Sequence, residues 1–440
     1  MLTASDNEML TCTGPGTPMG EFFRRFWQPV ALSRELPERD GTPLRVTVMG
    51  EKLVAFRDNQ GRVGLVDARC PHRGADMYFG RNEDGAIRCV YHGWQFDLHG
   101  RAVELPNVPP DSPYHQTMRI KAYPTREFGE IVWAYLGPPG TEPAEVPQLD
   151  FGMLPASQRF VTKKLQECNW AQSIEGALDT SHFSFLHMPA PAVQSNANPD
   201  APADEKRLRW IREDPLPQFS ILDHDVGFLV GGARRADGQM RYWRTAQFAL
   251  PAHSTTPSTL PGETHFGYTW VPIDDENCWI YTYAWNPDRP FSDEERARFA
   301  GGHGVIGEVD EHFIPVRNRS NEYLLDRRDQ KLHSFTGVRG VAEQDAMIQD
   351  SLGRIADRTI EHLTAADAAV VRFRRVVLGG AKALLAGQAP EAPHRYRSYR
   401  LRSGSWMAEQ GVPLAQVMVE RFGDPVGHVA EPLEEAPQAG

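Results

Sequence analysis

The sequence has few cysteines, no long apolar run and no excess of positive charge. Five of its 440 residues are cysteines. The first residues do not show the early positive charge followed by an apolar stretch that is typical of a secretion signal. We therefore expect reduced thiols or metal ligands rather than disulfides. No apolar run approaches the roughly 18 residues of a membrane-spanning helix. A net charge of -11 argues against a nucleic-acid or anionic-membrane surface. These absences predict a cytoplasmic protein without a membrane or nucleic-acid partner.

The length of the chain allows two domains, because single domains usually stop growing near about 250 to 300 residues. Residues 44–98 contain short runs of β-branched and apolar residues between turns rich in Asn, Asp and Gly, including AIRCVY at 86–91. This pattern predicts a small all-β domain. The strand-like IVWAYLG at 131–137 closes it, and the proline- and acid-rich segment 138–150 indicates a linker.

A helix is expected beyond the linker, in the sequence NWAQSIEGALDTSHFSF. Asn169 suits its N-cap, and Gln172, three residues later, resembles the partner in a capping box. Alternating stretches from 207 to 286 predict an antiparallel sheet. Helix-period apolar residues from about 342 to 385 predict a final helical region.

Two further segments are too polar for regular elements. The loop at 190–207 lies close to a candidate site described below, and long loops in such places often serve as lids. The tail from residue 423 is rich in Pro, Glu and Gly, and we expect it to be mobile.

Two pairs of cysteine and histidine occur within the β-rich region. Cys70 and His72 are separated by one residue, and Cys89 and His92 by two. Two thiolates and two imidazoles can bind zinc, or an iron-sulfur cluster in which histidines ligate one iron. Zinc sites usually pair cysteine with cysteine at close spacing, whereas each tight loop here offers one cysteine and one histidine. The pattern therefore favours the two-iron cluster.

The stretch resembles the Rieske 2Fe-2S motif, and its flanking residues agree with that motif: Pro71, Arg73, Gly74, Gly93 and Trp94. We expect Gly74, Gly85 and Gly93 to let backbone amides approach the sulfur atoms. A Rieske domain needs little more than the first third of the chain. Because the electron carrier is joined to a large second domain, we expect a second redox metal in that domain.

A second pair of histidines lies in EGALDTSHFSFLHMP, where His182 and His187 are five positions apart. On a regular helix such residues point about 140° away from each other. Either the two are unrelated structural histidines, or the chain bends to aim both at one point. Downstream of a Rieske motif, the stretch resembles the iron-binding helix of Rieske non-haem iron oxygenases. The resemblance implies that both histidines bind a mononuclear iron.

Asp179 stands one helical turn before the first of these histidines, close enough to accept its second N–H. By resemblance, this aspartate connects the Rieske histidine of one subunit to the iron histidine of its neighbour. It would then serve as an electron bridge across a subunit interface, and the protein would be a homo-oligomer, a trimer or stacked trimers.

The third iron ligand must be a carboxylate from far along the chain. Asp345 matches the late carboxylate of the family best, with Glu343 and Asp350 as rivals. From about residue 10 to 402 the chain resembles the phthalate dioxygenase branch. That resemblance implies an α+β chain of five parts: a helical arm (1–27) packed on the catalytic domain, an all-β Rieske domain (28–137), the linker (138–150), a catalytic domain with a curved antiparallel sheet surrounded by helices in a helix-grip-like arrangement (151–422), and the tail (423–440).

Members of this branch act on aromatic carboxylates and related anions, which need a cation in an otherwise apolar pocket. Arg244, in YWRTAQF, matches a position where the branch carries a substrate-facing arginine. Three other arginines are less specific candidates: Arg207, Arg209 and Arg241. Phe183 replaces a small hydroxylated residue of phthalate-specific members. This substitution argues against phthalate and favours a larger or more apolar ring, such as a phenoxybenzoate or a methoxybenzoate.

The resemblance implies one Rieske cluster and one mononuclear Fe(II) per subunit, with O2 as co-substrate. No Gly-rich dinucleotide fingerprint follows a strand here, so we expect a separate flavin and iron-sulfur reductase to supply electrons from NAD(P)H. The implied function is hydroxylation or dihydroxylation of an aromatic carboxylate. An O-demethylase or aryl-ether-cleaving monooxygenase is the alternative. A pure electron carrier and a zinc-binding module are the remaining classes.

Overall fold

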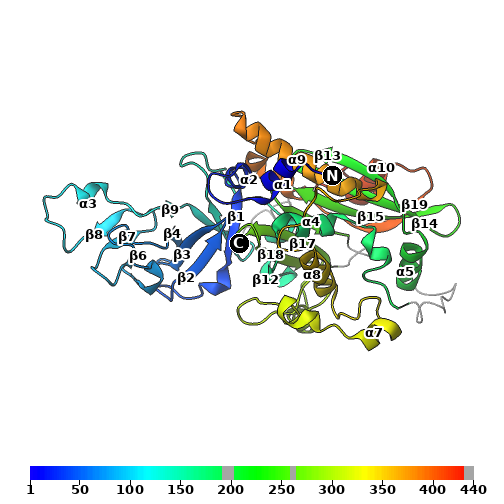
Figure 1. Ribbon diagram of the computed structural model, residues 1–440, viewed down its shortest axis with the longest axis horizontal. Coiled ribbons are helices and arrows are strands. Elements are labelled where there is room, and N and C mark those ends of the chain that lie inside the picture. The colour runs from blue at the N-terminus through cyan, green and yellow to red at the C-terminus, as the bar shows by residue number, and fades with distance from the viewer. Residues whose placement is uncertain (191–202, 258–263, 431–440) are drawn as a thin grey trace, which may run out of the picture.

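The computed structural model describes residues 1–190, 203–257 and 264–430 of the chain. Its strands form two groups, which lie one beside the other along the long axis of the molecule (Figure 1). The first group contains three antiparallel sheets: β1 (Trp27–Leu32), β11 (Ile131–Tyr135) and β10 (Thr125–Phe128); β2 (Leu44–Val48), β3 (Glu51–Arg57), β4 (Val63–Asp67) and β9 (Ala122–Tyr123); and β5 (Arg81–Glu83), β6 (Ala86–Arg88), β7 (Gln95–Asp97) and β8 (Ala102–Glu104). This group confirms the predicted all-β domain.

The strand predicted over AIRCVY is shorter than expected. β6 ends at Arg88, because the N–H of Cys89 bonds to the carbonyl of Trp94 and turns the chain out of the sheet. Beneath the loops that follow, Phe56, Met77 and Phe96 are fully buried in a small core that also contains both motif cysteines. This core gives the loops a rigid base.

The second group is a single antiparallel sheet, in the order β12 (Arg159–Gln166), β18 (Cys278–Trp285), β17 (His265–Pro272), β16 (His253–Thr256), β15 (Met240–Ala249), β14 (Gly227–Arg235) and β13 (Gln218–His224). β19 (Ser405–Glu409) pairs with β15 off this path. The sheet confirms the predicted antiparallel region and the α+β class. It provides the floor on which the helices of the candidate site lie.

Helices cover this sheet: α4 (Trp170–Leu178), α8 (Val341–Ser351) and α9 (Ala368–Leu385) pack on one another or on its strands. Trp170, Ile174 and Leu178 form the predicted apolar stripe of α4 and are buried. The N-terminal helices α1 (Ala4–Thr11) and α2 (Pro18–Phe23) pack against α9, as Figure 1 shows near its upper edge. The remaining helices are α3 (Tyr114–Thr117), α5 (Ala203–Glu213), α6 (Asp293–Ala300), α7 (Arg327–Leu332) and α10 (Leu414–Phe422).

The capping box expected at the start of α4 is not formed. Asn169 does cap α4 through its side chain, but Gln172 forms no capping box. The Gln172 side chain instead donates to the carbonyls of Gln349 and Gly353 and accepts from the N–H of Ala356, so that it joins α4 to the end of α8.

The helical region expected near 342–385 contains two helices. α8 ends at Ser351, shortly before Gly353 adopts a positive φ of 96° that a helix cannot contain. α9 begins only at Ala368.

The expected lid and tail fall partly outside the described residues. Of the loop at 190–207, residues 191–202 lie outside them, and Ala203–Glu213 forms α5. The expected mobile tail starts where α10 ends, yet its described part is tied down: His428 pairs with Leu401, and the N–H of Val429 donates to Arg400. Residues 431–440 lie outside the description. Within the described chain, no helix has the length and apolar character to cross a membrane.

Candidate metal centres

The two cysteine-histidine loops have the same backbone pattern. In the first, the N–H of Gly74 donates to the carbonyl of Cys70. In the second, the N–H of Gly93 donates to the carbonyl of Cys89. Both glycines have a positive φ, 72° and 76°, which side-chain-bearing residues rarely adopt. The loops therefore present their cysteines and histidines in matched positions.

Backbone amides reach a sulfur atom in the first loop, as expected beside Gly74. The N–H groups of Gly74 and Gly93 close the loops, and backbone hydrogen bonds from His72 and Arg73 reach the Cys70 thiol. Gly85 lies in the turn between β5 and β6. Burial raises the pKa of the Cys70 thiol to about 11, and the adjacent Cys89 adds to the shift. A thiolate there needs a cation or these amides to stabilise it.

The two imidazoles of the loops lie together. The ring centroids of His72 and His92 are 4.5 Å apart, and His72 stacks on Trp94 at 4.4 Å. Trp94 is held by a hydrogen bond from its Nε1 to Asn107. The two cysteine thiols are buried, and beside them Nδ1 of His72 is also buried and has no hydrogen-bond partner among the described residues. This arrangement fits a cluster in which the cysteines hold one iron and the histidines hold the other.

The second histidine pair converges because the chain leaves the helix between Leu178 and His182. α4 ends at Leu178, and Asp179 has an extended backbone with φ -82° and ψ 120°. A short 3-10 turn at His182–Ser184 follows. As a result, the Nε2 atoms of His182 and His187 lie 3.1 Å apart despite the five-residue spacing. Of the two alternatives that the sequence left open, the structure has the second: the chain bends and aims both histidines at one point.

Asp345 reaches the same point from α8. Its Oδ1 lies 3.7 Å from Nε2 of His182 and 3.3 Å from Nε2 of His187. The ligand atoms of these three residues all lie within 4.8 Å of one another. Two imidazoles and one carboxylate fit the facial set that holds ferrous iron with open positions.

The rival carboxylates are engaged elsewhere. Glu343 accepts from the backbone N–H of Glu308. Asp350 accepts from the side chains of Gln166 and Tyr323. Neither joins the histidines in the group that can hold a metal ion within the described residues.

Each imidazole has a hydrogen-bond acceptor on its far nitrogen. Oδ2 of Asp179 lies 3.4 Å from Nδ1 of His182, and the same carboxylate accepts from the N–H groups of Ser181 and His182. Oε1 of Gln344 lies 2.7 Å from Nδ1 of His187. Such partners fix the tautomer and orientation of a metal-binding histidine. The sequence offered no signal for Gln344, because its contact depends on how α8 packs.

Burial and the opposite charges act against each other in this cluster. Burial alone would raise the pKa of Asp345, but the hydrogen bond and charge of His187 outweigh it and lower the pKa. Burial likewise opposes ionisation of Asp179, whose pKa is nonetheless lowered by His182. Both carboxylates are therefore ionised near neutral pH. An ionised carboxylate is the form that binds a metal or accepts an imidazole N–H.

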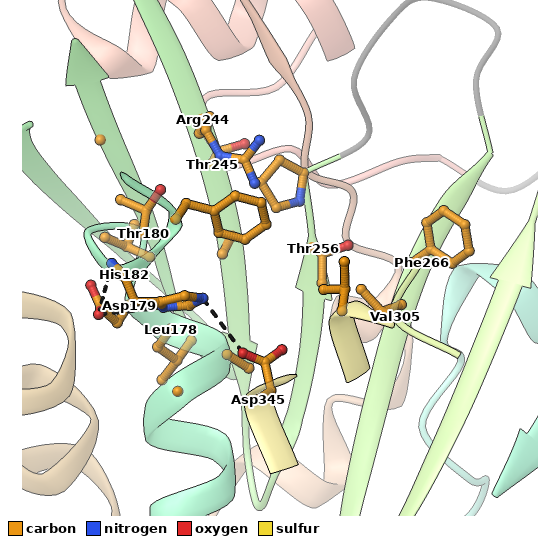
Figure 2. Close-up of a pocket in the computed structure, with 18 of the residues that line it drawn as sticks. Leu178, Asp179, Thr180, His182, Arg244, Thr245, Thr256, Phe266, Val305 and Asp345 are labelled. Carbon is orange, nitrogen blue, oxygen red and sulfur yellow. Dashed lines mark hydrogen bonds and ion pairs between the residues drawn. The ribbon is translucent and has the colours of Figure 1, made fainter. Parts of the chain in front are cut away.

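A cavity of about 200 Å³ lies beside this group, lined by His182 and Asp345. Figure 2 shows Asp345 and His182 on one side of it and Arg244 on another. Most of its wall is apolar, with contributions from Leu178, Val230, Ala246, Phe266 and Val305. Among the described residues that line the cavity, Arg244 is the one arginine or lysine. An apolar pocket with one fixed cation suits a ring that carries an anionic substituent.

Arg244 is buried, with 7% of its surface exposed. Its guanidinium lies over the ring of Phe183 at 4.2 Å from the centroid, and that ring meets the ring of His187 at 4.5 Å. The Nε of Arg244 is buried and has no partner in the part of the chain described. Of the other predicted arginines, Arg209 pairs with Asp237. Neither Arg207 nor Arg241 is among the described residues that line the cavity.

Thr180 and Arg234 are site residues that the sequence did not reveal. Arg234 is fully buried, and it donates to the backbone carbonyl and the hydroxyl of Thr180. Burial lowers the pKa of its guanidinium to about 10, which leaves it charged at neutral pH. Thr180 lines the cavity. An arginine on β14 thus holds the chain next to Asp179, a contact that only the folded sheet creates.

This fold, with a Rieske-like pair of loops and a separate two-histidine, one-carboxylate group, defines a Rieske-type oxygenase. Residues 26–124 match the Rieske 2Fe-2S domain, and residues 134–399 match the family described as LigXa C-terminal domain like. The chain belongs to the Rieske non-haem iron oxygenases, as an oxygenase subunit of the phthalate dioxygenase branch. It is an enzyme of this type, with a Rieske cluster and a non-haem iron as cofactors.

Curated relatives differ in reaction. The chain is 38% identical to the phthalate 4,5-dioxygenase oxygenase subunit of Pseudomonas putida, over 88% of each chain. It is 33% identical to the 3-chlorobenzoate-3,4-dioxygenase oxygenase subunit of Comamonas testosteroni, over 94% of this chain and 96% of that one. Among solved structures, dicamba monooxygenase bound to 3,6-dichlorosalicylic acid matches with a TM-score of 0.58 at 18% identity, over 84% of this chain and all of that one. This structural likeness supports the fold.

Proposed function

We propose that the chain is a terminal oxygenase component that hydroxylates or dihydroxylates an aromatic carboxylate. The observation that carries this proposal is the apolar cavity between Asp345 and the buried cation Arg244. A carboxylate bound at Arg244 would hold an attached ring across the cavity, next to the metal-binding residues. The relatives that act on phthalate and on 3-chlorobenzoate support an aromatic acid.

The ligand roles follow from the donor sets described above. Cys70 and Cys89 would hold one iron of the cluster, and His72 and His92 the other. The mononuclear iron would be held by His182, His187 and Asp345. When bound, that iron supplies the activation of O2 that the reaction requires. Everything else in the cavity serves to bind, orient and shield the substrate.

Three side chains would orient the ring. Arg244 binds the carboxylate in a charge-assisted pair, which is strong because the site is buried. Phe183 lies between this guanidinium and His187, and it sets how closely the ring approaches the metal. The hydroxyl of Thr180 accepts from Arg234, so its own hydrogen is directed elsewhere and can be donated to a substrate oxygen. The apolar wall excludes water that would compete for these contacts.

Phe183 also bears on which acid fits. Its ring lies against the guanidinium of Arg244, at 4.2 Å from the centroid, and we propose that it would crowd a second carboxylate on the substrate ring. We therefore favour a ring with a single carboxylate and an apolar or ether substituent over phthalate itself. A relative named 5,5'-dehydrodivanillate O-demethylase oxygenase subunit, 31% identical, keeps O-demethylation as the second candidate. Which reaction follows depends on the group that the ring presents to the metal.

Electrons would come from a separate reductase and reach the mononuclear iron through Asp179 of a neighbouring subunit. His92 is only partly buried, and exposed apolar residues lie near it in sequence, Val90 and Tyr91. Figure 1 shows β6, β7 and β8 at one end of the molecule, away from α4 and α8. The far end of α8 offers its own exposed apolar side chains, Ile348 and Leu352. Head-to-tail contact of these two surfaces would close a ring, such as a trimer.

An oxygen-consumption screen tests this proposal. The protein with a surrogate reductase and NADH is offered benzoates, phenoxybenzoates, methoxybenzoates and phthalate, and products are identified. We expect uptake coupled to hydroxylated product for monocarboxylates. Equal turnover of phthalate and the monocarboxylates would remove the role given to Phe183. Uptake with none of them would reject the substrate class, and release of formaldehyde would favour the O-demethylase.

A further inference from the structure

Gln344 makes two hydrogen bonds that together fix its amide. Its Oε1 lies 2.7 Å from Nδ1 of His187, and its Nε2 donates to the backbone carbonyl of Val338 at 2.8 Å. Gln344 and Asp345 are consecutive residues of α8, and each of them contacts His187. Val338 is buried, with 1% of its surface exposed, so its carbonyl lies in a fixed part of the fold.

The carbonyl of Val338 determines which way the amide points. A carbonyl oxygen only accepts, so the Gln344 nitrogen, and not its oxygen, must face it. The Gln344 oxygen then faces His187, and that oxygen also only accepts. Nδ1 of His187 must therefore carry the hydrogen of the neutral ring. In the neutral ring, Nε2 therefore has the lone pair that a metal would take; in the metal-free protein this atom faces Asp345 and can carry the proton that the carboxylate accepts.

We infer that Gln344 is a positioning residue that sets the orientation of His187 and the tautomer in which this ring binds the metal. The inference rests on the ligand role proposed for His187. It gives the two imidazoles unlike supports, because His182 faces the carboxylate of Asp179 whereas His187 faces a neutral amide. An amide acceptor fixes the ring without adding negative charge beside the cavity. Acceptors of this kind typically change metal affinity 10- to 100-fold when removed.

The test uses the cluster-containing protein, stripped of its mononuclear metal and titrated with Co(II). Gln344→Met keeps the side-chain volume but removes the acceptor, and we expect about 10- to 100-fold weaker Co(II) binding. Gln344→Glu keeps the acceptor for His187 but loses the donor to Val338, and we expect it to bind Co(II) no more than a few-fold weaker than the wild type. Gln349→Met is the matched control, because it removes a buried amide of α8 that contacts Ser173 rather than His187.

The outcomes separate this inference from the proposed function. Retained affinity in Gln344→Met overturns the inference, and so does a loss in Gln344→Glu as large as the expected loss in Gln344→Met. The second comparison remains available even if Gln344→Met does not fold. A loss in Gln349→Met equal to that in Gln344→Met would assign the effect to helix packing and also overturn it. His187→Ala must abolish the Co(II) site; if it does not, the proposed ligand set fails instead.

Discussion

His182 and His187 face each other through their Nε2 atoms at 3.1 Å, although a continuous helix would point them apart. The chain achieves this by ending α4 at Leu178 and extending at Asp179. The carboxylate of Asp179 then supports the start of the turn that follows, because it accepts from the N–H groups of Ser181 and His182. One aspartate thus both shapes the turn and supports the first imidazole.

Asp179→Asn should leave both metals in place but cut electron transfer between them. An asparagine oxygen can still accept from Ser181, so the turn is retained, while the negative charge beside His182 is lost. We expect reoxidation of the reduced cluster, with substrate and O2 present, to slow by about 10- to 100-fold. Stopped-flow absorption of the cluster measures the rate. Wild-type reoxidation in this variant would remove the bridging role.

Arg244→Gln should weaken substrate binding. The variant loses a charge-assisted pair worth roughly 1.5–3 kcal/mol, which corresponds to about a 10- to 100-fold rise in KM for the carboxylate. Arg241→Gln on the same strand is the control, because Arg241 is not among the described residues that line the cavity. Steady-state kinetics with the acid and with its neutral amide separate charge from shape. An equal rise in KM for acid and amide would contradict the anchoring role.

Gly340→Ala should destabilise the start of the helix that carries Asp345. Gly340 caps α8 with a φ of 95°, and an added Cβ would clash with Oε2 of Glu343. We expect a loss of about 1–3 kcal/mol in unfolding free energy. Gly379→Ala is the control, because that residue lies inside α9 with no atom near an added Cβ. The control should gain about 0.5–1 kcal/mol. Denaturant unfolding measures the change in unfolding free energy for each variant, and the two changes should have opposite signs.

Acid should destabilise the protein through its buried neutral histidines. Burial lowers the pKa of His253 to about 3 and that of His265 to about 4. Below the ordinary histidine pKa of about 6.5, the unfolded chain binds protons that the folded chain refuses, so stability falls as the pH drops from about 6.5 toward 4. His253→Gln should flatten that slope, by up to about 1.4 kcal/mol per pH unit. An unchanged slope in thermal unfolding between pH 4 and 6.5 would refute this role.

The sequence predicted the parts of the site that depend on local spacing. Cys70, His72, Cys89 and His92 lie in two short loops whose glycines and aromatic neighbours form a recognisable motif. The antiparallel strands were visible because their apolar residues alternate. The local pattern could not show where α4 ends, because Asp179 leaves the helix through contacts with the turn beyond it.

The remaining site residues depend on packing between distant segments. Asp345 could be selected among three carboxylates only by resemblance, and the contacts of Glu343 and Asp350 explain why they are not available. Gln344 and Arg234 have no sequence signal, since each acts on a residue more than 50 positions away. Gln172 was misassigned for the same reason, because its partners lie at the end of α8 and just beyond it.

Iron content tests the central claim most directly, because two metal centres in one chain require it. We predict about three irons per chain in the wild type, two in the cluster and one apart. The double variant His182→Ala, His187→Ala should hold about two, with the visible spectrum of the Rieske cluster unchanged. A wild type with two irons, or a double variant that still holds three, would contradict a mononuclear iron at His182, His187 and Asp345.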